Sequence, residues 1–119
     1  MASGESGKGQ FRLIVTALQT WRDLIYSGLS GRDCRRAAFE IDKRIAKAAR
    51  RYPQVKPLEE KWSETFDLFL KYTAAIESRF LRDPATIRAL AGRIRKSADE
   101  LIHRFTLLNV CGAPLETER

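Results

Sequence analysis

The residues best suited to metal chemistry in this sequence are Glu100 and His103, which form a Glu-x-x-His element. Carboxylate-bridged di-metal bundles use two such elements and two further glutamates, all facing the bundle interior. The chain has one histidine, so the second element is absent. At 100° per residue, Glu100 and His103 also lie on the polar side of their helix. We therefore predict neither a metal site nor a cofactor.

Nucleophilic catalysis has no better support. Cys34 falls among the apolar residues of its predicted helix, where a buried thiol is inert. Cys111 belongs to the C-terminal tail, and nothing near it in the sequence suggests an activated thiol. The neighbouring carboxylates Glu59 and Glu60 stand in the first turn of a predicted helix, where they complement the helix dipole. We expect a protein without enzymatic activity.

A glycine-rich stretch near the start, Gly4 to Lys8, resembles the end of a phosphate-binding loop, GxxxxGK[ST]. The motif requires a leading glycine and a hydroxyl after the lysine. Ala2 and Gly9 occupy those two positions. We therefore interpret residues 1–9 as a flexible leader.

The strongest functional signal is the segment 32–52, which carries eight Lys/Arg against three acids, a local net charge of +5 out of +7 for the chain. On a helix most of these cations fall on one side, in a basic stripe about 27 Å long. The alanine-rich side with Ile41 and Ile45 lies opposite. The candidate phosphate-binding residues are Arg32, Arg35, Arg36, Lys43, Arg44, Lys47, Arg50 and Arg51, with Arg35 and Arg44 on the flanks.

A basic helix face is often simply solvated and held by salt bridges. Two features favour a function here. The next helix carries five acids against four bases, too few to neutralise the stripe. Uncompensated like charges on a helix also repel by a few tenths of a kcal/mol per pair.

The elements that position these residues are four amphipathic helices, at about 10–29, 32–52, 57–82 and 84–108. Apolar residues recur at helical spacing in each, as in Leu13, Ile14, Ala17, Leu18 and Trp21. Short loops between long helices predict an all-α antiparallel four-helix bundle, as one domain over residues 10–108. Residues 109–119 are expected to form a flexible tail.

Prolines mark two of the boundaries. Tyr52 precedes Pro53 and so ends the basic helix, while Pro57 suits the first position of the next one. Asp83 followed by Pro84 predicts an N-cap and the start of the last helix. The aromatic stripe from Trp62 to Phe80 is expected to be the main packing seam rather than a cofactor or base-stacking surface.

The basic stripe and the overall positive charge favour an anionic partner, with nucleic acid first. We expect phosphate contacts, with RNA, including duplex RNA, favoured over sequence-specific DNA, because the helices are long and no short recognition helix follows a tight turn. Three alternatives stay open at this point. The basic helix docks an acidic partner protein, the protein binds anionic membrane surfaces, or it is an enzyme of a kind the sequence does not reveal.

Several residues have secondary roles in this interpretation. Phe39 lies beside the stripe and is expected to pack on a neighbouring helix rather than stack on bases. Arg88, Arg95 and Lys96 would extend the stripe if their helix lay next to it. Val15, Arg22 and Tyr26 are candidates for self-association, and a homodimer would double the stripe. No run of about 20 apolar residues and no secretory leader is present, so we expect a cytoplasmic or nuclear protein.

Overall fold

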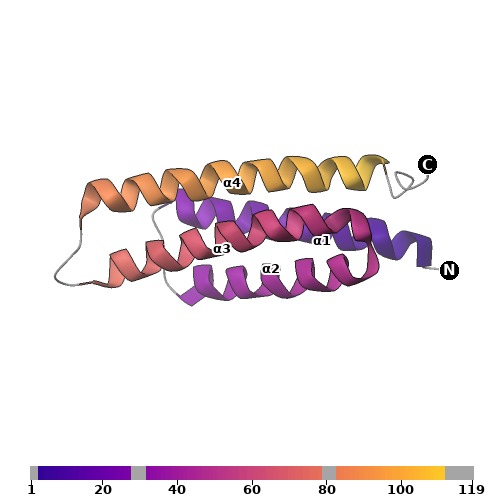
Figure 1. The fold of residues 1–119 in the computed structure, drawn as a ribbon, viewed down its shortest axis with the longest axis horizontal. Helices are drawn as coiled ribbons and strands as arrows, with labels where there is room; N and C mark the ends of the chain where they lie inside the picture. The colour runs from indigo at the N-terminus through magenta and orange to yellow at the C-terminus, as the bar shows by residue number, and fades with distance from the viewer. Residues whose placement is uncertain (1–2, 28–31, 79–82, 112–119) are drawn as a thin grey trace.

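The computed structural model of the chain describes the backbone of residues 3–27, 32–78 and 83–111 and the side chains of residues 9–27, 32–78 and 83–108. Its elements are α1 (Ser3–Tyr26), α2 (Arg32–Arg51), a 3₁₀ turn η1 (Pro53–Val55), α3 (Lys56–Glu77) and α4 (Pro84–Cys111). No described residue lies in a β-strand. The predicted all-α antiparallel bundle is confirmed (Figure 1).

The four helices pack in a ring in which neighbours in sequence are neighbours in space. α1 packs mainly against α2 and α4, and α3 packs mainly against the same two helices. α2 and α4 are therefore diagonal to each other, as Figure 1 shows with α4 at the top and α2 at the bottom. The start of α1, the end of α4 and the turn from α2 to α3 lie at one end of the bundle.

The interior is aromatic at its centre. Trp21 of α1 makes edge contacts with Trp62 and Phe69 of α3, at centroid distances of 5.2 and 5.3 Å. All three side chains are buried, which confirms that this part of the α3 aromatic stripe is core. Phe80 lies outside the described residues. The α2 residues that face this interior are small or β-branched, and the buried ones are Cys34, Ala38, Ile41, Ile45, Ala48 and Ala49.

The predicted boundaries around the prolines are close to the observed ones. Tyr52 is extended, with φ −126° and ψ 106°, as expected of a residue before proline. The Asp83 carboxylate caps α4, accepting bonds from the Ala85 N–H at 3.3 Å and the Thr86 hydroxyl at 2.6 Å. Pro57 occupies the second rather than the first position of α3, because Lys56 already belongs to the helix.

The ends of three helices differ from the prediction. α1 begins at Ser3 rather than near residue 10, so most of the predicted leader is helical. The glycines in this stretch lower helix propensity by about 1 kcal/mol each, yet a helix already nucleated by packed residues gains one hydrogen bond per added residue. α4 runs to Cys111, and α3 ends at Glu77, with Ser78 extended. Residues 112–119 of the predicted tail lie outside the described residues.

Two residues of α1 were misassigned. Leu13, predicted to be core, is 51% exposed, whereas Phe11, which was left out of the predicted core, is buried. Phe11 packs edge-on against Tyr52 at 5.3 Å and lies 6.2 Å from Phe105 of α4. Phe11 thus places an aromatic ring against Tyr52, the residue that follows α2, while the side chain of Leu13 is left half exposed.

Candidate nucleic-acid interface

The eight candidate phosphate-binding residues all belong to α2. Arg44 is half-buried, and the other seven side chains are exposed. Their arrangement follows from the alanine-rich inner face, because burial of that face leaves the opposite side of α2 in solvent.

Two of the eight are engaged by acids. Arg35 forms an ion pair with Glu77 of α3. Arg44 pairs with Glu40 one turn earlier on α2, at 3.1 Å. Both residues were predicted to lie on the flanks of the stripe. Arg35 lies where α2 adjoins α3, and Arg44 lies one turn after Glu40 on α2 itself.

The remaining six make no ion pair with any other described residue. We call these six residues the α2 basic face, and they are Arg32, Arg36, Lys43, Lys47, Arg50 and Arg51. The Arg51 guanidinium lies 5.6 Å from the Tyr52 ring centroid, the only aromatic contact of this face within the described chain.

The acids of α3 leave this face uncompensated. Of its five acids, Glu77 is the one that pairs with α2 in the described part of the chain. Asp42 of α2 is directed to α3, where it accepts a 2.9 Å hydrogen bond from the indole nitrogen of Trp62. Within the described chain, the α2 basic face therefore has no acidic side chain paired with it.

A hollow of about 370 Å³ adjoins the α2 basic face where α1 meets the end of α2. Its walls are Gly9, Gln10 and Leu13 of α1 and Arg44, Lys47 and Arg51 of α2. Sequence reasoning missed the α1 wall because it depends on which helix lies beside α2. The sequence carries no signal for it, because Leu13 belongs to the apolar helical pattern and its 51% exposure is seen only in the structure.

The ring of Phe39 meets Phe66 of α3 edge-on at 5.6 Å, while half of its side chain stays exposed. The predicted packing on a neighbouring helix is thus observed. The cations of α4 do not extend the α2 basic face, because α4 is diagonal to α2. The condition under which Arg88, Arg95 and Lys96 would extend the stripe, a position of their helix next to α2, is therefore not met.

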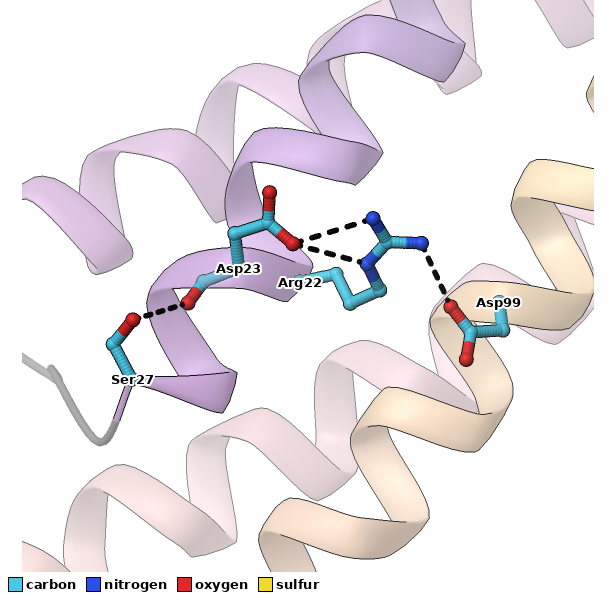
Figure 2. Close-up of polar contacts among 4 residues, drawn as sticks. All are labelled: Arg22, Asp23, Ser27 and Asp99. Carbon is cyan, nitrogen blue, oxygen red and sulfur yellow. Dashed lines mark hydrogen bonds and ion pairs between the residues drawn. The ribbon is translucent and has the colours of Figure 1, made fainter.

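The candidates for self-association have other contacts. Arg22 of α1 lies between two carboxylates, 3.2 Å from Asp23 and 3.0 Å from Asp99 of α4 (Figure 2). The hydrogen bond to Asp99 raises the pKa of Arg22 above its usual value. Val15 is half-buried, and Tyr26 is 71% exposed with the Arg95 guanidinium over its ring.

The residues considered for metal and thiol chemistry do not belong to the α2 basic face. Glu100 pairs with Lys61 of α3 at 3.1 Å and with Arg104 at 3.3 Å, and the bond from Lys61 lowers its pKa. His103 is exposed. Cys34 is buried, and this burial raises the pKa of its thiol to about 11. Among the described residues, no group of three or more His, Cys, Asp or Glu side chains is placed to hold a metal ion.

Comparison with known proteins adds no identification: no family model, curated protein or solved structure matches the chain. In the described part of the chain, no helix has the length and apolar character needed to cross a membrane.

Proposed function

We propose that this chain is a non-enzymatic nucleic-acid-binding protein that contacts the phosphate backbone through the α2 basic face. The observation that supports this most is the set of six exposed Lys and Arg side chains on one helix with no ion pair to another described residue. The negative charge of bound phosphates offsets the repulsion between these cations. Each neutralised phosphate also releases condensed counterions, which favours binding further.

The chemistry of the face favours backbone contacts over base reading. α2 contains no Asn, Gln, Ser or Thr, so it lacks the amides that read adenine and the hydroxyls that support other base contacts. Lys and Arg along a straight helix suit a regular row of phosphates. Binding that depends on shape and phosphate position is typical of duplex RNA recognition, and we therefore favour RNA.

The length of α2 supports a duplex as ligand. Its 20 residues span about 30 Å at 1.5 Å per residue, enough to follow the backbone over several base pairs. A second copy of the chain would double this row, and we include a homodimer in the proposal. We also infer a cytoplasmic or nuclear location, where nucleic acid is accessible.

The test is a titration of the full chain with a random-sequence duplex RNA, the matching duplex DNA and one single strand, at about 50 and about 200 mM salt. We expect duplex RNA to bind most tightly and its affinity to fall by at least about tenfold between the two salt concentrations. An absence of binding to all three at low salt would contradict the proposal, and stoichiometric binding of an acidic protein would then replace it.

A further inference from the structure

A second surface, separate from the α2 basic face, lies between α1 and α4. It consists of two adjoining hollows of about 460 and about 320 Å³ that share Tyr26 and Arg95. Both fall in the size range of small-ligand sites. Most residues that line the larger hollow are charged, whereas the smaller is lined in part by the buried side chains of Ile25 and Tyr72.

The centre of this surface is an aromatic–cation pair. The Arg95 guanidinium carbon lies 4.6 Å from the centroid of the Tyr26 ring. Tyr26 is nevertheless 71% exposed. A half-covered ring beside an arginine offers two flat surfaces on which a nucleobase stacks, the ring itself and the guanidinium plane.

Both acids of the larger hollow are paired with the same arginine. Arg22 bridges Asp23 and Asp99, and Figure 2 shows its side chain between the two carboxylates, one from each helix. The other cations that line the two hollows, Arg88, Arg95 and Lys96, make no ion pair with any described residue. The combined surface is thus positive where a phosphate would enter.

From these observations we propose that the groove between α1 and α4 is a binding site for a nucleoside phosphate. The base stacks on Tyr26, and the phosphate contacts Arg88, Arg95 or Lys96. An aromatic platform next to a positive rim is the arrangement by which proteins hold single nucleotide units without reading their sequence. This site is separate from the α2 basic face, because α4 is diagonal to α2.

Gly92 allows this site to be closed without damage to the fold. It lines the larger hollow, and a Cβ added to it would meet no atom within 4 Å. Gly92→Leu therefore projects a side chain into the hollow. Gly9, in the α1–α2 hollow, is equally open and makes Gly9→Leu a matched control.

The experiment is a calorimetric or NMR titration of the full chain with adenosine 5′-monophosphate, with adenosine and inorganic phosphate as partial ligands. We expect the nucleotide to bind at least about tenfold more tightly than either part. Gly92→Leu and Tyr26→Leu should each weaken it by about tenfold, the size of one base stack. Gly9→Leu should leave it unchanged.

Two sources of this ligand are separated by a 5′-phosphorylated trinucleotide titrated in parallel. Tighter binding of the trinucleotide would identify the ligand as the unpaired end of a strand. Tighter binding of the monophosphate would identify it as a free nucleotide. The inference is overturned if neither binds, or if Gly92→Leu and Tyr26→Leu leave the affinity unaltered. Duplex RNA binding by the same two variants should match that of the unaltered chain, which separates this site from the α2 basic face.

Discussion

The indole nitrogen of Trp62 in α3 donates a 2.9 Å hydrogen bond to the carboxylate of Asp42 in α2. Trp62 is buried, so Asp42 satisfies a polar group that the core would otherwise leave unpaired. The same bond directs one of the three acids of α2 toward α3 and away from the outer cations. Packing of the α2–α3 interface and the charge of the α2 basic face are thus linked through one residue.

Asp42→Ala is expected to destabilise the fold by about 1–2 kcal/mol, because it leaves the Trp62 N–H without its acceptor. Asp42→Asn keeps a carbonyl oxygen in the same place, and its loss of stability should be less than half that of Asp42→Ala. Urea unfolding followed by tryptophan fluorescence measures both, since Trp21 and Trp62 are buried. Equal losses in the two variants would show that the hydrogen bond is not the cause.

Arg35 and Arg36 form a matched adjacent pair with different surroundings. Arg35 is paired with Glu77, whereas Arg36 makes no ion pair within the described chain. Arg36→Ala should weaken RNA binding by about three- to tenfold at low salt, and Arg35→Ala by clearly less, because Glu77 already offsets its charge and repels phosphate. Filter-binding or anisotropy measurements compare the two. A larger effect of Arg35→Ala would contradict this division of the stripe.

Asp83 makes the start of α4 sensitive to acid. The hydrogen bond from the Thr86 hydroxyl, with the Ala85 N–H, lowers the pKa of Asp83 in the folded protein. Its stabilising effect is therefore complete above the unfolded pKa near 4 and is lost as the pH falls through the lower folded value. Asp83→Ala should lower the Tm by about 4 °C at pH 7 and by much less at pH 2. Thermal unfolding by circular dichroism tests this, and a pH-independent difference would refute it.

Cys34 is expected to be unreactive while the protein is folded. Burial raises the pKa of its thiol from 9.0 to about 11, so about 0.1% is thiolate at pH 8. In a Cys111→Ser background, alkylation at pH 8 should be at least about a hundredfold slower in the native protein than in denaturant. Because the folded pKa is the higher one, stability should also fall as the pH rises from about 9 to about 11. Fast alkylation of the native protein would place the thiol at the surface.

The helical class and the inner face of α2 could be predicted from the sequence because burial follows helical periodicity directly. Cys34, Ile41 and Ile45 fall on one side of the wheel and are buried together. The Asp83–Pro84 boundary was predictable for a similar reason, since an N-cap and the following proline act locally.

The partners of individual charges could not be predicted in this way. The Arg35–Glu77 pair joins residues 42 positions apart, and it exists only because α3 lies beside α2. The same holds for the α1 wall that Leu13 contributes and for the Tyr26–Arg95 stack. These contacts depend on the neighbour order of the helices, which amphipathic patterns do not specify.

The central claim is that the α2 basic face binds phosphates as one unit. The direct measurement is the salt dependence of duplex RNA binding for two triple charge reversals. The first is Lys43→Glu, Lys47→Glu and Arg50→Glu. The second, as control, is Arg12→Glu, Lys71→Glu and Arg93→Glu, which alters exposed residues of the other three helices that also make no ion pair within the described chain.

Both triple variants carry the same net charge, so a difference between them reports position rather than total charge. We predict that the α2 variant loses binding or shows a slope of log K against log salt smaller by about 2–3, with helicity and Tm nearly unchanged. The control should keep most of its affinity and its slope. Equal loss in both variants, or collapse of the fold in the α2 variant alone, would contradict the claim.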